Sequence, residues 1–322
     1  FKQKTAYEIR LSLVGSEMCI RDRSNGANAN SAVGYNAMRL NSTGGSNTSL
    51  GYESLYSTTT GANNTAVGGL ALYANTTGGS NVAIGYAALD ANTTGDYNVA
   101  IGMNALTAQN AQGYNTAVGA NCMQTTTSGQ YNAAVGRQAL YANTTGSHNV
   151  AMGYDALAAN TTGNQNTAIG KKALYANTTA GNNTAIGDRS LEANTTGTQN
   201  TALGKTALQA NTTASYNTAA GSSALYSNTT GAENTAVGRT ALYANTTASN
   251  NTAVGSNALG VNTTGSNNTA VGKGALDANT TGSSLVAIGN GALGANTTAS
   301  QNIAIGQNAL ATNTTGARNV AV

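Results

Sequence analysis

Apolar and polar residues recur along most of the chain with one strict period. A glycine that follows a small and an aliphatic residue recurs at every 17th position from Gly34 to Gly306, without insertion or deletion. The consensus unit reads N-T-A-V-G-x-x-A-L-Y-A-N-T-T-G-x-x, and we number its positions 1 to 17, so that this glycine is position 5. Alternation at positions 1–4 predicts a short β-strand. The glycines and the Asn-Thr-Thr segment predict turns.

The regularity of the period indicates how the units pack. Units of constant length are typical of solenoids, in which each repeat stacks on the next. Seventeen residues with two glycine-marked breaks leave no room for a pair of helices. The sequence therefore predicts an all-β fold, a parallel β-solenoid (β-roll) of about 17 coils with one unit per coil, stacked about 4.8 Å apart.

The residue types at each position predict an inside and an outside. Position 4 is aliphatic in nearly every unit, position 2 is mostly Thr, Val or Ile, and position 9 is almost always Leu. We expect these three positions to point inward, so that Ile169 and Leu174 are buried. Charged residues of the repeats fall at positions 6, 7, 10, 16 and 17, so Lys171 and Lys172 should be exposed.

Alanine fills positions 3 and 8 almost throughout, as at Ala168 and Ala173. Strict alternation would turn these alanines outward, opposite the aliphatic side chains. An outward alanine stripe indicates either close approach of another surface, such as a sister chain, or a sterically tight bend. Both interpretations stay open.

Residues 1–23 share nothing with the repeats. The segments Lys2–Ile9 and Leu13–Asp22 resemble conceptual translations of a sequencing primer and a transposon-type adapter. We therefore expect residues 1–23 to be a non-native, disordered segment and residues 24–322 to be the solenoid domain. This removes Cys19 from consideration, and Cys122 alone offers no intrachain disulfide.

Charge is sparse and balanced. Of the net +3, residues 1–23 hold five basic and three acidic side chains, which leaves nine basic and eight acidic side chains, or +1, for the repeats. A near-neutral domain gives no reason to expect nucleic acid or an anionic membrane as partner. No apolar run of about 18 residues is present, so no membrane span is expected.

Asparagine recurs at positions 1 and 12. Stacked Asn side chains at the turns of a solenoid can hydrogen-bond from coil to coil, and Gln109 supplies a second amide at position 12. The alternative is N-glycosylation, because position 12 opens an Asn-x-Thr motif. The candidate glycosylation sites are Asn75, Asn92, Asn143, Asn160, Asn177, Asn194, Asn211, Asn228, Asn245, Asn262, Asn279, Asn296 and Asn313.

Two further rows could bind ligands. Tyrosine recurs at position 10, as at Tyr175, where it indicates either a solvent-facing position with occasional stacking or an aromatic strip for carbohydrate. Threonine rows at positions 13 and 14 could form a regular array that binds ice. No catalytic, cofactor or metal constellation is found, and the one histidine, His148, falls at exposed position 17, so we expect no enzymatic activity and no cofactor.

The unit resembles known fibre repeats. Asn81-Val82-Ala83-Ile84-Gly85 followed by Ala88-Leu89 resembles head repeats of trimeric autotransporter adhesins, and the string from Asn166 to Thr179 is similar to repeats of bacterial and phage tail-fibre-domain proteins. The resemblance covers 24–322 and implies a left-handed parallel β-roll that assembles as a trimer. The adhesin repeat is shorter than this unit, however, so its cross-section need not transfer.

Together these patterns predict a structural or adhesive fibre segment. We expect a rigid spacer or head of a bacterial surface protein or phage tail fibre, located outside the cell, at its surface or on a virion. The expected partners are other copies of the chain, as a homotrimer or an end-to-end filament, and surface glycans. End-to-end association follows from our expectation that the chain is a fragment, because it stops in mid-unit at Val322. A glycan-decorated filament and an ice- or surface-binding solenoid are the alternatives.

Overall fold

Each repeat forms one short strand at positions 2–4, followed by turns that return the chain to the start of the next strand. The computed structural model describes residues 12–13, 16–17, 29–111 and 113–322. From Ser31 onward these residues form an all-β parallel solenoid of about 17 coils, each coil being one repeat, and the described residues contain no helix. The predicted fold class is confirmed.

The chain divides into two units, 1–131 and 132–322. The repeat strands of the first unit are β3 (Ser31–Val33), β4 (Thr48–Leu50), β5 (Thr65–Val67), β6 (Val82–Ile84), β7 (Val99–Ile101) and β8 (Thr116–Val118). Those of the second are β9 (Ala133–Val135), β10 (Val150–Met152), β11 (Thr167–Ile169), β12 (Thr184–Ile186), β13 (Thr201–Leu203), β14 (Thr218–Ala220), β15 (Thr235–Val237), β16 (Thr252–Val254), β17 (Thr269–Val271), β18 (Val286–Ile288), β19 (Ile303–Ile305) and β20 (Val320–Ala321).

The first unit also holds a short antiparallel pair, β1 (Ser12–Leu13) and β2 (Ser16–Glu17). This pair falls in the adapter-like segment. The rest of that segment, residues 1–11, 14–15 and 18–23, lies outside the described residues. Its expected disorder stays a prediction.

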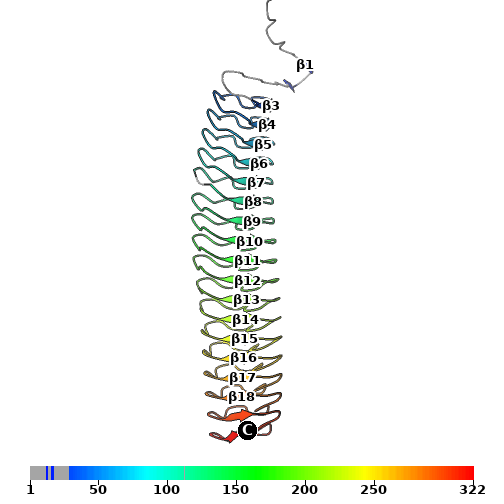
Figure 1. Cartoon of the computed structure of the whole chain (residues 1–322), viewed down its shortest axis with the longest axis vertical. Helices are drawn as coiled ribbons and strands as arrows, with labels where there is room; N and C mark the ends of the chain where they lie inside the picture. The colour runs from blue at the N-terminus through cyan, green and yellow to red at the C-terminus, as the bar shows by residue number, and fades with distance from the viewer. Residues whose placement is uncertain (1–11, 14–15, 18–28, 112) are drawn as a thin grey trace, which may run out of the picture. The chain divides into compact units, whose positions relative to one another are not determined.

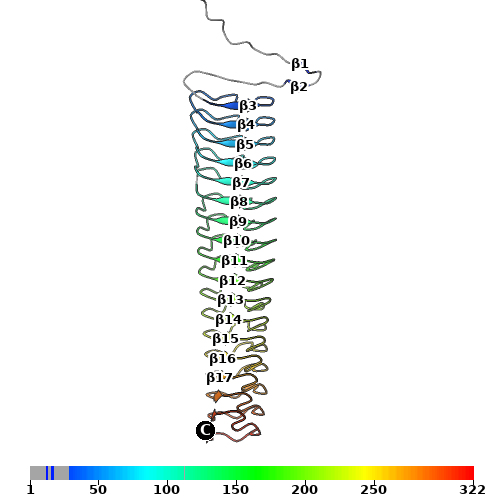
Figure 2. The ribbon, with the colours of Figure 1, turned by 45° about the vertical axis from the view of Figure 1, so that its right-hand side comes forward.

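Consecutive repeat strands within each unit pair in parallel, and the register is always one full repeat. Val150 pairs with Thr167, and Thr167 pairs with Thr184. Within each unit the strands therefore lie one above another on the same side of the coil (Figures 1 and 2). Like side chains stack in rows as a result.

Hydrogen bonds to the adjacent coils continue around the turns. In the second unit the backbone N–H of Thr167 donates to Asn183 O at 2.8 Å, that of Lys172 to Tyr154 O at 2.9 Å, and that of Leu174 to Ser190 O at 3.0 Å. A buried backbone group that lacks a partner is costly, so each coil depends on its neighbours. One coil alone would lack these partners.

Left-handed backbone at three positions per coil makes the turns tight. Lys172 at position 7, Leu174 at position 9 and Asn182 at position 17 have φ values of 55°, 51° and 62°, and the other coils repeat this pattern. Non-glycine residues in this region cost about 1–3 kcal/mol each, and they persist only where the surrounding structure enforces them. Glycine at position 5 is required for a second reason: a Cβ on Gly170 would lie 2.5 Å from the carbonyl oxygen of Gly187.

The predicted direction of the strand side chains is wrong by one residue. Ala168 and Ala173 are fully buried, whereas Ile169 and Thr167 are partly exposed. The outward alanine stripe therefore does not exist, and the close-approach interpretation falls with it. Leu174 is buried and Lys171 is exposed, as predicted, but Lys172 is only partly exposed.

The interior is too narrow for aliphatic side chains on both walls, and the one coil with serine at both position 3 and position 8 shows this directly. Ser49 at position 3 and Ser54 at position 8 are both buried. The Ser49 hydroxyl lies at 3.0 Å from Ser54 O and also within hydrogen-bond distance of the Ser54 hydroxyl. Positions 3 and 8 thus contact each other across the interior, and alanine at both leaves the remaining space to Leu at position 9. Charged residues of the described repeats are exposed or partly exposed, with the exception of Asp155, which is 9% exposed.

Candidate functional site

Two rows of asparagine run through the interior beside the leucines. At position 12, Asn177 donates from Nδ2 to Asn160 Oδ1 at 3.0 Å, and Asn194 donates to Asn177 Oδ1 at 3.0 Å. Asn177 also donates to the carbonyl of Ala180 in its own coil at 3.0 Å. The predicted asparagine ladder is confirmed at this position, and it satisfies amides that are otherwise buried without partners.

The row at position 1 uses different atoms. The backbone N–H of Asn183 donates to Asn166 Oδ1 at 3.1 Å, and Asn166 Nδ2 donates to Ala180 O at 2.8 Å. The carbonyl of Ala180 is therefore shared by one asparagine from each row. Leu285 replaces the asparagine in one coil and offers no side-chain acceptor to the next. Gln109, at position 12, also contacts this row: its Nε2 donates to Asn98 Oδ1 at 3.1 Å, and its Oε1 accepts from Asn115 Nδ2 at 3.0 Å.

The ladder bears directly on the candidate glycosylation sites. The residues without exposed surface are Asn75, Asn92, Asn143, Asn160, Asn177, Asn194, Asn211, Asn228, Asn245, Asn262, Asn279 and Asn296. Asn313 is exposed. In the folded coil the twelve buried amides are therefore inaccessible to an enzyme, and a glycan on any of them would displace the ladder. Glycosylation at these positions would have to precede folding and would oppose it.

The outward face of the sheet presents positions 2 and 4. Val237, Ile186 and Leu203 are each about two-fifths exposed, at 38%, 40% and 39%, and Val or Ile occupies position 4 in most other coils. No charged residue occurs at position 2 or 4 in any repeat. Each unit thus carries a row of Thr, Val and Ile side chains on a parallel sheet. The absence of charge at positions 2 and 4 is visible in the sequence, but it is interpreted as burial when these positions are expected to point inward.

Tyrosines stack in rows along the coil edges. At position 10, Tyr226 and Tyr243 have ring centroids 5.1 Å apart with planes 8° apart. A row that sequence reasoning missed lies at position 17, where Tyr97, Tyr114 and Tyr131 stack at 5.2 Å steps. Because stacked rings cover each other's faces, the rows present ring edges to solvent, which suits coil-to-coil stabilisation better than a sugar platform.

The threonines at positions 13 and 14 do not form one array. The Thr161 hydroxyl at position 13 lies at 3.1 Å from Thr178 O in the next coil, while Thr162 at position 14 is exposed. The first row is thus engaged in the coil-to-coil contacts. Ice binding through these rows stays a prediction.

Among residues 29–111 and 113–322, no cluster of three or more His, Cys, Asp or Glu side chains is placed to hold a metal ion. His148 is exposed, as expected. Burial raises the pKa of the Cys122 thiol to about 12 and also raises the pKa of the half-buried Asp90 carboxyl.

No helix long and apolar enough to cross a membrane occurs in the described part of the chain.

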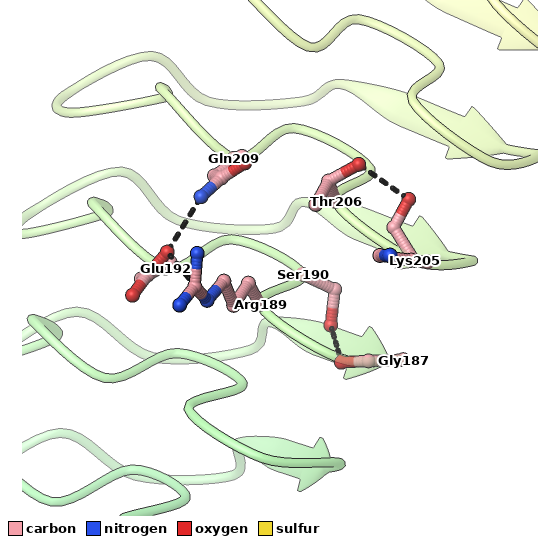
Figure 3. Close-up of polar contacts among 7 residues, drawn as sticks. All are labelled: Gly187, Arg189, Ser190, Glu192, Lys205, Thr206 and Gln209. Atoms are coloured by element: carbon pink, nitrogen blue, oxygen red, sulfur yellow. Dashed lines mark hydrogen bonds and ion pairs between the residues drawn. The ribbon is translucent and has the colours of Figure 1, made fainter.

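Charged side chains gather on one edge, at positions 6 and 7. Figure 3 shows part of this edge in the second unit, where Arg189 Nε at position 7 lies 4.0 Å from Glu192 at position 10. Glu192 also accepts from Gln209 Nε2, at position 10 of the next coil, at 2.6 Å. Lys205 and Thr206 lie on the same edge, and the Thr206 hydroxyl lies at 2.8 Å from Lys205 O. Arg189 and Glu192 thus form an ion pair within one coil.

A scan against protein-family models finds no match to the chain, and a search of curated proteins finds none either.

Proposed function

We propose that the repeat domain is a structural segment of an extracellular fibre, a spacer or head of a bacterial surface protein or phage tail fibre. We further propose that copies of the chain associate through the outward face of the sheet. The observation that carries this proposal is the charge-free row of Thr, Val and Ile at positions 2 and 4. Position 10, which is also partly exposed, admits Asp90, Glu192 and Gln209.

The size of this face supports association with another copy. In the second unit the twelve strands β9–β20, at about 4.8 Å per strand, make a row about 55 Å long and, with two outward side chains, about 10 Å wide. Two copies would bury about 1,100 Å², which is just above the roughly 1,000 Å² that a specific interface should exceed. A patch of this extent lies at the upper end of what monomers expose, and the largest patches on monomers are often functional.

Self-complementarity favours the chain itself as the partner. Rows of identical side chains at a constant spacing match a second copy of the same row without further adaptation. The coil-to-coil hydrogen bonds and the asparagine ladder stiffen each unit, which suits a spacer. The glycan-decorated filament is less well supported, because twelve of its thirteen candidate asparagines are buried.

The experiment is light scattering on the full chain and on a variant with Ile169→Glu and Val237→Glu. Both side chains are on the outward face, so the variant should fold as the parent does but dissociate to monomers. Lys171→Glu is the control, because Lys171 is an exposed cation on the edge next to this face. This variant should leave the oligomer intact. A parent chain that is monomeric at high concentration would remove this proposal.

A further inference from the structure

A row of cations follows one edge of the second unit with a period of two coils. Position 6 is occupied in every second coil by Arg137, Lys171, Lys205, Arg239 and Lys273. All five side chains are exposed. They account for five of the nine basic residues of the repeats, so the near-neutral total of the domain conceals a one-sided distribution.

Backbone hydrogen bonds fix the spacing of this row. Ser223 N donates to Lys205 O at 2.9 Å, Thr240 N to Ser222 O at 3.0 Å, and Asn257 N to Arg239 O at 3.0 Å. Each bond joins position 7 of one coil to position 6 of the coil before it, so the edge advances by one coil height per repeat. Cations in alternate coils are therefore about 10 Å apart along the stack.

The coils between the cations carry uncharged polar side chains. From Lys205 onward, position 6 reads Lys205, Ser222, Arg239, Ser256 and Lys273. Position 7 beside it reads Thr206, Ser223, Thr240 and Asn257. None of the three cations forms an ion pair in the described part of the chain. Nearer the start of the unit Asp188 interrupts the row, so the uninterrupted strip is 205–273.

We propose that this strip binds an extended acidic polysaccharide that carries one carboxylate per disaccharide. A sugar residue in an extended chain advances by about the height of one coil, so carboxylates on alternate sugars would face the cations. The hydroxyls and amides between the cations can bond to the neutral sugars. The inference rests on the proposed extracellular role and names a ligand class for it.

The spacing argues against nucleic acid as the ligand. A nucleic-acid strand carries one phosphate about every 3.4 Å. A strip with a single cation for every two coils would leave most of these phosphates unpaired. Sparse charge at a matching period favours the polysaccharide.

The experiment measures binding of the full chain to hyaluronan oligosaccharides and to the same oligosaccharides with reduced carboxyl groups. The parent should bind hyaluronan, more weakly as salt increases, and should not bind the neutral derivative. Arg239→Gln with Lys273→Gln should weaken binding by about tenfold or more. Arg39→Gln with Arg318→Gln makes the same change in net charge outside residues 205–273 and should have little effect.

A second variant tests the period itself. Ser222→Arg with Arg239→Ser keeps the composition but moves one cation by a single coil, and it should weaken binding as well. Position 6 already holds Ser and Asn in other coils, so these variants should fold. Absent binding, equal loss in both charge variants, or tighter binding to single-stranded DNA would overturn the proposal. The strip lies on the edge next to the outward face of the sheet, but the two tests change different residues, so loss of polysaccharide binding and loss of assembly can be told apart.

Discussion

Asn177 donates from Nδ2 to Oδ1 of Asn160, one coil away, over 3.0 Å, and neither side chain has exposed surface. The same hydrogen bond from Nδ2 to Oδ1 of the preceding coil recurs along the second unit, so each side-chain amide both donates and accepts. Such a row of hydrogen bonds stabilises the fold only when every amide is present, because a missing amide leaves a buried partner unsatisfied.

Asn177→Ala should therefore destabilise more than the loss of one contact suggests. The substitution removes the donors to Asn160 and Ala180 and the acceptor of Asn194. We expect a loss of about 2–4 kcal/mol in the free energy of unfolding, since each orphaned buried group costs about 1–3 kcal/mol. Thermal and denaturant unfolding followed by circular dichroism measure it.

Thr179→Ala is the matched control, because it removes the same Asn-x-Thr motif but alters only an exposed side chain. Its effect should stay within about 0.5 kcal/mol. Equal losses in the two variants would mean that the ladder contributes no stability.

Gly136→Ala tests the close approach of coils at position 5. Gly136 has φ of 135°, and a Cβ there would lie 2.5 Å from the carbonyl oxygen of Gly153. Neither the backbone angle nor the contact can be accommodated without moving the next coil, so we expect a loss of more than about 2 kcal/mol. Hydrogen exchange should show the protection lost around residues 136–153.

Gly146→Ala provides the comparison within the same repeat. Gly146 is at position 15, where Ala180 is buried without disrupting its coil. The repeats before and after Ala180 have glycine at this position, as do the repeats before and after Gly146, so the surroundings match. A Cβ on Gly146 would meet Asn143 Oδ1 and lie 2.5 Å from the carbonyl oxygen of Gly163, but Gly146 has no left-handed φ and four repeats hold a buried Ala at this position. The Gly146 variant should therefore lose less stability than the Gly136 variant. If both glycine variants behave alike, position 5 has no special requirement.

The period, the register and the asparagine ladder could be predicted from the sequence, but the phase of the strand could not. Alternation places Thr167 and Ile169 on one face and Ala168 on the other, and it leaves open which face is inside. Size favoured Ile169 as the core residue. The tight left-handed turns bring the two walls so close that only small side chains, such as those of Ala168 and Ala173, fit between them.

One signal for the correct phase was present. Ser49 is the single serine at position 3, and its coil also carries Ser54 at position 8. A paired exchange of this kind indicates two positions in contact. The net charge does not reveal the strip of Lys205, Arg239 and Lys273, because it sums the charges on all edges of the coil.

Ala168→Glu and Thr167→Glu form a pair of substitutions one residue apart on β11. Ala168 is fully buried, so a carboxylate there lacks both water and a partner, and we expect a loss of more than about 3 kcal/mol. Thr167 points outward, so its variant should lose less than about 1 kcal/mol. Hydrogen exchange in residues 150–190 distinguishes the two, and equal tolerance of both would contradict the assigned phase.

Cys122 offers a test of burial that depends on pH. It sits at position 8, has no exposed surface, and its thiol pKa is raised to about 12 from an ordinary value near 9. Because the folded state disfavours the thiolate, the stability from this burial is present below about pH 9 and is lost as the pH rises toward 12.

Alkylation measures the same burial in a Cys19→Ser variant, where Cys122 is the remaining thiol. Iodoacetamide at pH 8 should react far more slowly with the folded protein than with the denatured protein, since the thiolate is the nucleophile. Cys122→Ala should abolish the additional loss of stability between pH 9 and 12. Rapid alkylation of the folded chain at pH 8 would show that position 8 is accessible to solvent, which contradicts the burial of Cys122.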